Sequence, residues 1–210
     1  MISPSKENIL KKIRKALTQS TPLPFPQSEG NSSVFQPSQQ ELEVEFAEQF
    51  TRLQGKFVFC ANYAELVLQL QNLLVHNKWE KALCQEEGLM ATLAANGYGQ
   101  PWHPVLSTCD VAITSCDYLV ARTGSVVLSS GSESGRTTSV YAPVHICIAT
   151  SSQLVYDIKD ALQGMREKYG SELPSQISFA TGPSRTADIE KTLVVGIHGP
   201  GEAYVFLVDQ

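Results

Sequence analysis

The fold is decided by residues 56–84, KFVFCANYAELVLQLQNLLVHNKWEKALC. Residues 56–60 form a short apolar run that is typical of a buried strand. Asn62 and Glu65 have the spacing of a helix cap, and leucines then recur at helical spacing up to residue 74. Residues 81–84 form a second short strand. A strand, a helix and a strand in succession indicate a βαβ unit with parallel pairing.

The alternation of strands and helices continues on both sides of this unit. Upstream, Ser38 and Glu41 form a capping box before a helix that ends at Gly55. Downstream, apolar runs predict strands at residues 111–114, 118–121, 125–128, 144–149, 177–180, 193–197 and 204–208, with helices at 88–95 and 154–170. The first three strands are closely spaced and indicate hairpins or an inserted meander. We therefore expect a three-layer α/β/α domain with a mixed, mainly parallel sheet.

The N-terminal residues form a separate predicted unit. Pro4 suits the first position of a helix in which Ile9 and Ile13 share one face, with Lys and Arg on the other. Residues 19–38 are rich in Pro, Ser and Gln, which is typical of a linker or an extended arm. The sequence predicts an arm over residues 1–37 and an α/β domain over 38–210. The arm helix must bury its apolar stripe on the main domain or on another subunit, which makes a homo-oligomer possible.

Composition excludes several classes of protein. The chain has 210 residues, 42% of them hydrophobic, and a net charge of −5 without a long basic run. These values predict a globular domain that binds no nucleic acid and inserts into no membrane. An amphipathic, Lys-rich N-terminus in place of a secretory h-region predicts the cytoplasm. Five widely spaced cysteines match no zinc or iron–sulfur pattern, so we expect reduced thiols, no metal and no cofactor.

The run of residues 181–190, TGPSRTADIE, is the first candidate binding site. Gly182 permits a backbone angle that other residues avoid, and Pro183 suits the start of a helical turn. Ser184 or Thr186 could cap that turn. Arg185 could hold a small anion, because its planar fork bonds two oxygens at once.

The same run has a purely structural alternative. Asp188 and Glu190 follow where a helix start favours negative charge, and either could pair with Arg185 to hold the loop together. Local chemistry alone favours this capped turn over an anion site.

A second candidate loop covers residues 129–138, SSGSESGRTT. Its glycines and hydroxyls, with Arg136, could cradle a phosphate or carboxylate. A loop without a ligand fits the composition equally well. Glu133 is a candidate carboxylate nucleophile, although a loop of this kind is poorly suited to positioning one.

The histidines supply candidate catalytic groups. His76 and His103 are expected at the surface and in a loop. His145 begins a buried strand and His198 precedes Gly199, and each alone suits a structural role. Together with Asp188 and Glu190 they form the candidate acid–base set, because all would meet near strand ends.

Several of these motifs together resemble the lactate-utilisation (LUD) domain family, from about residue 40 to the C-terminus. The resembling residues are Thr114, the runs 121–125 (ARTGS), 143–146 (PVHI), 182–190 (GPSRTADIE) and 196–200 (GIHGP), and Arg136. The resemblance implies a fold related to the sugar-phosphate isomerase and coenzyme A transferase group. It also implies a role beside two iron–sulfur-type partner proteins that oxidise L-lactate to pyruvate. The predicted ligand-binding set is Thr123, Gly124, Arg136, Gly182, Pro183, Ser184, Arg185, Thr186 and Gly199.

Three functions from different classes follow. The first is an accessory subunit of an L-lactate oxidation system that binds a small anion or partner proteins, with the redox centres on those partners. The second is a stand-alone isomerase or acyl-transferase with Glu133 or Asp188 as base or nucleophile. The third is a regulatory or scaffold protein that assembles through its N-terminal helix.

Overall fold

The computed structural model describes residues 4–18, 40–189 and 192–209. The chain divides into two compact units, Met1–Pro37 and Ser38–Gln210. In the first unit, helix α1 (Pro4–Leu17) carries five basic residues and one acidic residue, and its Ile9 and Ile13 are exposed. No helix among the described residues is both long and apolar enough to cross a bilayer.

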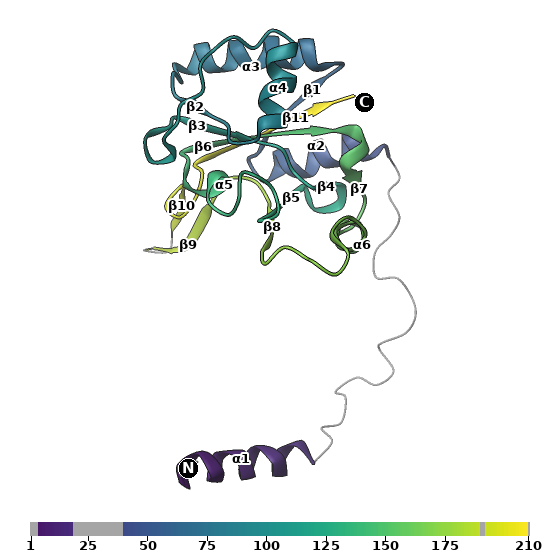
Figure 1. Ribbon diagram of the computed structural model, residues 1–210, viewed down its shortest axis with the longest axis vertical. Helices are drawn as coiled ribbons and strands as arrows, with labels where there is room; N and C mark the ends of the chain where they lie inside the picture. Colours follow the sequence, from purple (N-terminus) through teal and green to yellow (C-terminus); the bar gives the residue numbers. More distant parts are fainter. Residues whose placement is uncertain (1–3, 19–39, 190–191, 210) are drawn as a thin grey trace. The chain divides into compact units, whose positions relative to one another are not determined.

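The second unit is built on a five-stranded parallel sheet in the order β1–β11–β6–β3–β2 (Figure 1). Its strands are β1 (Lys56–Cys60), β2 (Ala82–Leu83), β3 (Val111–Thr114), β6 (Val144–Thr150) and β11 (Glu202–Val208). Helix α3 (Tyr63–Asn77) connects β1 to β2, and its cap forms as the sequence predicts. Asn62 accepts a hydrogen bond from the Glu65 N–H at 2.9 Å, while the Glu65 carboxylate accepts one from the Ala61 N–H at 2.9 Å.

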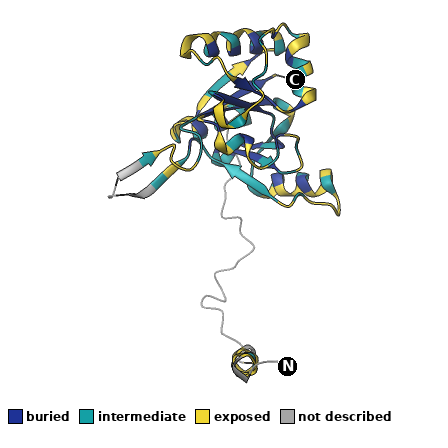
Figure 2. Cartoon of the chain, turned by 60° about the vertical axis from the view of Figure 1, so that its left-hand side comes forward, coloured by how far each residue is buried: buried dark blue, intermediate teal, exposed yellow. Residues whose placement is uncertain are grey.

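The two faces of this sheet are covered differently. Helices α3 and α4 (Glu87–Ala95) lie on one face, where Ile146 and Ile148 of β6 are buried. Helix α2 (Leu42–Arg52) and a second sheet lie on the other face, against Cys147 and Ala149. Figure 2 shows the buried residues concentrated in the strands and the exposed ones on the outer sides of the helices.

Helix α2 departs from its predicted ends. Glu41 is its N-cap and makes no side-chain cap bond, while Ser38 of the predicted capping box lies outside the described residues. Gln54, not Gly55, takes the positive φ of 68° beyond the helix. Gly55 is required for a different reason, because a Cβ there would lie 2.4 Å from the Phe50 ring.

The second sheet has four strands in the order β7–β4–β5–β8. They are β4 (Tyr118–Val120), β5 (Ser125–Ser129), β7 (Leu154–Val155) and β8 (Ile177–Ala180). Helix α6 (Ile158–Tyr169) packs on β4 and β7, so the predicted helix over 154–170 begins four residues late and Leu154 belongs to a strand. The predicted α/β class with a mixed, mainly parallel sheet is confirmed, and the closely spaced strands from residue 118 onward form this second sheet.

The run 181–190 is not a helical turn. Strand β9 (Arg185–Ile189) pairs antiparallel with β10 (Thr192–Val195), so the two form a hairpin. Gly182 does have a positive φ, 78°, as its position predicts. The predicted helical turn does not form, because residues 185–189 pair with β10. This pairing depends on tertiary contacts and cannot be predicted from Pro183 or from a capping hydroxyl.

Candidate functional site

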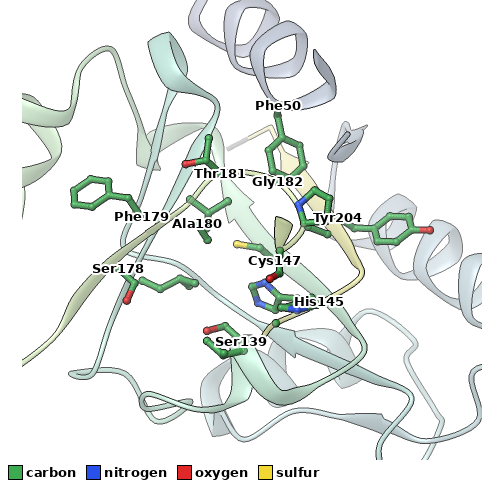
Figure 3. Close-up of a pocket in the computed structure, with 18 of the residues that line it drawn as sticks. Phe50, Ser139, His145, Cys147, Ser178, Phe179, Ala180, Thr181, Gly182 and Tyr204 are labelled. Carbon is green, nitrogen blue, oxygen red and sulfur yellow. The ribbon is translucent and has the colours of Figure 1, made fainter. Parts of the chain in front are cut away.

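A cavity of about 280 Å³ lies between the two sheets, bounded by β6 and β11 on one side and by β5 and β8 on the other. Two short loops, at residues 181–184 and 198–200, close its remaining sides, and Phe50 of α2 points into it (Figure 3). The rings of Phe179 and Tyr204 point away from its centre, so these two residues line it mainly with backbone. The cavity lies where two sheets and two loops meet, and a concave site of this kind is a common place for a ligand.

His145 of β6 supplies the most informative polar group. It is 5% exposed, and its Nε2 lies 2.9 Å from the Thr114 hydroxyl oxygen. The Thr114 hydroxyl donates its one proton to the Ser115 carbonyl at 2.8 Å, so His145 Nε2 must be the donor in the other bond. The neutral ring then carries its proton on Nε2. Among the described residues Nδ1 has no hydrogen-bond partner, and it is an acceptor.

The protonation state of His145 follows from its burial. Desolvation disfavours the charged imidazolium and lowers the pKa of His145 from 6.5 to about 4. The ring is therefore neutral at pH 7 and offers a hydrogen-bond acceptor in place of a positive charge.

The two closing loops are joined by backbone hydrogen bonds. The Ser184 N–H donates to the Pro200 carbonyl at 2.8 Å, and the Gly196 N–H donates to the Ser184 carbonyl at 2.9 Å. Close approach requires glycine at two positions: a Cβ on Gly182 would lie 2.5 Å from the Leu53 carbonyl oxygen, and one on Gly199 would lie 3.0 Å from the Ser184 Cβ. The loops thus form one wall, with His198 exposed beside the cavity.

A row of hydroxyls reaches the cavity from the second sheet. The Thr123 and Ser125 hydroxyl oxygens are 2.7 Å apart, and Ser125 and Thr181 are 2.9 Å apart. Thr181 lines the cavity, whereas Thr123 is two hydrogen bonds removed from it. Thr123 therefore orients a lining residue and does not itself line the cavity.

The chemistry of the cavity is largely apolar, with hydroxyl and imidazole groups. Among the described residues that line it there is no Asp, Glu, Lys or Arg. Such a site can hold a small ligand through Ser, Thr and His hydrogen bonds on a hydrophobic wall.

The structure brings together six of the residues predicted from sequence and places others elsewhere. His145, Gly182, Pro183, Ser184, His198 and Gly199 line the cavity. Gly124 does not, and its positive φ of 60° serves packing, since a Cβ there would lie 2.5 Å from the Phe50 backbone nitrogen. Arg185 is exposed at the start of β9, and Thr186 follows it outside the lining. The side chain of Asp188 and all of Glu190 lie outside the described residues.

The Gly/Ser loop at residues 129–138 is held by internal contacts and does not line the cavity. Arg136 is exposed and donates to the Ser175 hydroxyl. Glu133 accepts a hydrogen bond at 2.7 Å from the Glu87 N–H at the start of α4. That contact gives Glu133 a structural partner in the first turn of a helix, where a carboxylate is stabilising.

Sequence reasoning missed several lining residues, including Phe50, Ser139, Cys147 and Ser178. Cys147 could have been found, because it lies two residues after His145 on the same face of a strand. Phe50 could not, because only tertiary packing brings α2 to the cavity.

The cysteines are all buried and unbridged. Burial raises the pKa of the Cys60 and Cys84 thiols to about 11. A hydrogen bond with Cys116, together with burial, raises the pKa of Cys147 well above its ordinary value. Among the described residues, no group of three or more His, Cys, Asp or Glu side chains is placed to hold a metal ion.

Comparison with known proteins places these features in a family. A family model described as the LUD domain matches residues 100–208, which contain every lining residue except Phe50. Lactate utilization protein C of Anoxybacillus flavithermus is 33% identical over 193 residues, covering 85% of this chain and 86% of that protein. The protein of the same name from Halalkalibacterium halodurans is 42% identical over 102 residues, covering 48% of this chain and 44% of that protein. The chain thus spans about half the length of that relative and of others like it.

The fold recurs in a solved structure. It is the 1.70 Å crystal structure of a DUF162 family protein from Deinococcus radiodurans, with a TM-score of 0.60 over 82% of this chain and 99% of that one. At 18% sequence identity the likeness supports the architecture alone.

Proposed function

This chain belongs to the LUD domain family, and on that premise we propose that it is a component of a lactate-utilisation system that binds a small ligand in the inter-sheet cavity. The names of the relatives support the first half of the proposal. The geometry of the cavity supports the second half.

The observation that carries the proposal is the convergence of two sequence motifs on one cavity. Residues 182–184 and 198–200 belong to the motifs that resemble the family, and a hydrogen bond from the Ser184 N–H to the Pro200 carbonyl joins their backbones. Both ranges line the cavity together with His145. Three segments that are far apart in the sequence thus line one small space. Protein interiors are closely packed and contain few voids. The stability of the fold therefore gives no reason for this space to stay unfilled.

We propose that the ligand is a small hydroxy or oxo acid. A hydroxyl group of such a ligand can donate to His145 Nδ1, while Ser178, Thr181 and Ser184 offer hydroxyls to its polar atoms. A carboxylate is best placed at the solvent-exposed side of the cavity, beside His198, because the buried, neutral His145 offers it no charge. Arg185 follows Ser184 in the chain and is the proposed outer contact for the same carboxylate.

The proposed system places the redox centres on iron–sulfur partner proteins. The sequence supports this division, because its cysteines have no cluster-ligating spacing and it contains no nicotinamide fingerprint. The chain then acts as an accessory subunit that holds ligand or partner in place. A stand-alone transferase role for Glu133 has less support, because Glu133 bonds the start of α4 away from the cavity.

The binding half is tested by titrating the purified chain with L-lactate and pyruvate and following heat release. The variant Ala180→Leu fills the cavity, whereas Ala91→Leu adds the same side chain to the exposed face of α4. Binding should be lost in Ala180→Leu alone. Absence of binding in the wild type, or equal binding in both variants, would argue against the cavity as the site.

The system half is tested by mixing the chain with iron–sulfur proteins of a lactate-utilisation system. Lactate-dependent reduction of an electron acceptor should require the chain and should fall with Ala180→Leu. Undiminished lactate oxidation without the chain would remove it from the system.

A further inference from the structure

A second concavity lies at the edge of the parallel sheet, where β1 meets α2. Its volume is about 710 Å³, and its apolar floor is formed by Val44, Ala47, Phe57 and Phe59. Phe59 is 48% exposed and Val44 45% exposed, which is unusual for side chains of this size. Strand β1 is an end strand, so this groove, lined by α2 and β1, follows an edge of the sheet.

The rim of the groove is acidic. Glu41, Glu43, Glu48 and Asp209 line it, and no Lys or Arg is among its described lining residues. An apolar floor with four carboxylates at its border suits a partner that is apolar along one stripe and basic at the sides of that stripe.

Helix α1 has that composition. Its Ile9 and Ile13 lie one turn apart and are 58% and 49% exposed. At 100° per residue, Lys12 and Arg14 flank this apolar stripe on opposite sides. The helix has 14 residues and is about 21 Å long, close to the roughly 17 Å of a five-residue strand such as β1.

We propose that the groove binds helix α1 of a second copy of this chain. Residues 18–41 separate α1 from α2, far more than the roughly two to eight residues that usually join helices packed within one subunit. A connection of that length suits an exchange of arms. Reciprocal docking covers both apolar stripes and both grooves in a closed two-fold dimer, which leaves no further groove for a third copy. This inference does not depend on the ligand of the inter-sheet cavity.

The full-length chain tests this by analytical ultracentrifugation. The wild type should be a dimer whose Kd rises with salt, because the contacts are between exposed charges. Two double variants should each weaken the dimer by at least about tenfold: Glu43→Lys with Glu48→Lys in the groove, and Lys12→Glu with Arg14→Glu in α1. The pair Glu167→Lys with Glu172→Lys, which adds the same charge to exposed positions in and after α6, should leave the dimer unchanged.

Mixing the two double variants distinguishes the exchange of α1 between two chains from the binding of α1 to the groove of its own chain. One contact of the mixed dimer joins the basic α1 to the acidic groove as in the wild type, and the other joins the two glutamates introduced in α1 to the two lysines introduced in the groove. A heterodimer should therefore form more tightly than the homodimer of either variant. Thermal melts establish that each variant is folded before mixing. A monomeric wild type, or variants that stay monomeric when mixed, would overturn the proposal, and so would a dimer that neither double variant weakens.

Discussion

His145 Nε2 lies 2.9 Å from Thr114 Oγ1 across the pairing of β6 with β3. The bond fixes which nitrogen of a buried imidazole carries the proton. It therefore makes the other nitrogen a hydrogen-bond acceptor in a residue that lines the cavity.

Thr114→Val should disrupt this arrangement with little change in side-chain volume. The buried Nε2–H would lose its acceptor, which should lower the free energy of unfolding by about 1–3 kcal/mol in urea denaturation. Imidazole 15N shifts should show loss of the single tautomer. The control Thr92→Val removes a hydroxyl that bonds Gly88 on the surface of α4, and it should cost under about 0.5 kcal/mol. If both variants lower the free energy of unfolding equally, the Thr114–His145 hydrogen bond contributes no more to stability than the surface bond of Thr92.

The depressed pKa of His145 predicts a pH dependence of stability. Above pH 6.5 the imidazole is neutral in both the folded and the unfolded chain, so its protonation does not reduce the free energy of unfolding. As the pH falls toward 4, the unfolded chain binds a proton that the folded chain resists, so the free energy of unfolding decreases by about 3 kcal/mol in total. His145→Gln should lack this component, whereas His76→Gln, at an exposed position, should retain it. A wild type and a His145→Gln variant with parallel pH profiles would contradict the assignment.

Gly182→Ala should damage the wall of the cavity. Alanine would be strained at φ 78°, and its Cβ would approach the Leu53 carbonyl oxygen to 2.5 Å, so we expect a loss of at least about 2 kcal/mol of stability. Gly88→Ala in α4 meets nothing within 4 Å and should be neutral or stabilise by up to about 1 kcal/mol. Thermal melts compare the stability of the two variants. A Gly182→Ala variant as stable as the wild type would mean that the loop at residues 181–184 can move away from Leu53.

Glu86 should hold the Gly/Ser loop in place. Its buried carboxylate accepts hydrogen bonds from the Ser115 N–H at 3.0 Å and from the Ser134 hydroxyl at 2.6 Å. Glu86→Ala should therefore speed amide hydrogen exchange across residues 131–138 and cost about 3 kcal/mol. Glu86→Gln keeps one acceptor oxygen and should lose less, and Glu80→Ala at the surface should change neither quantity. Unchanged exchange in Glu86→Ala would show that other contacts suffice.

The sequence predicts those parts of the fold that local chemistry determines. The Asn62 cap and the apolar runs of β1 and β6 identify their elements, because periodicity and capping act within a few residues. The sequence does not predict that β9 and β10 form a hairpin. A Gly-Pro-Ser start suits a helical turn as well as a strand, and only the pairing of the two strands distinguishes them. The second sheet, in which β4–β5 and β5–β8 pair antiparallel and β4–β7 pair parallel, is visible in sequence only as closely spaced strands, because its order depends on long-range contacts.

The candidate site divides in the same way. The sequence alone singles out three residues that line the cavity, His145, Gly182 and Gly199. Histidine can transfer protons and glycine permits unusual backbone angles, so these residue types draw attention without knowledge of the fold. Arg136 and Arg185 lie at the surface and do not line the cavity, so the anion contact predicted for them stays a prediction. Phe50 is missed because an apolar residue at helical spacing is indistinguishable from the rest of the core.

The position of β11 between β1 and β6 has a consequence for biosynthesis. Lys56 and Glu202, whose side chains pair across β1 and β11, are 146 residues apart in the chain. Among the described strands β1 pairs with β11 alone. While the ribosome translates the intervening residues, β1 and the exposed Phe59 therefore have no strand to join. Until β11 emerges from the exit tunnel, the nascent chain therefore exposes an unpaired apolar strand, the kind of surface that makes folding intermediates prone to aggregation.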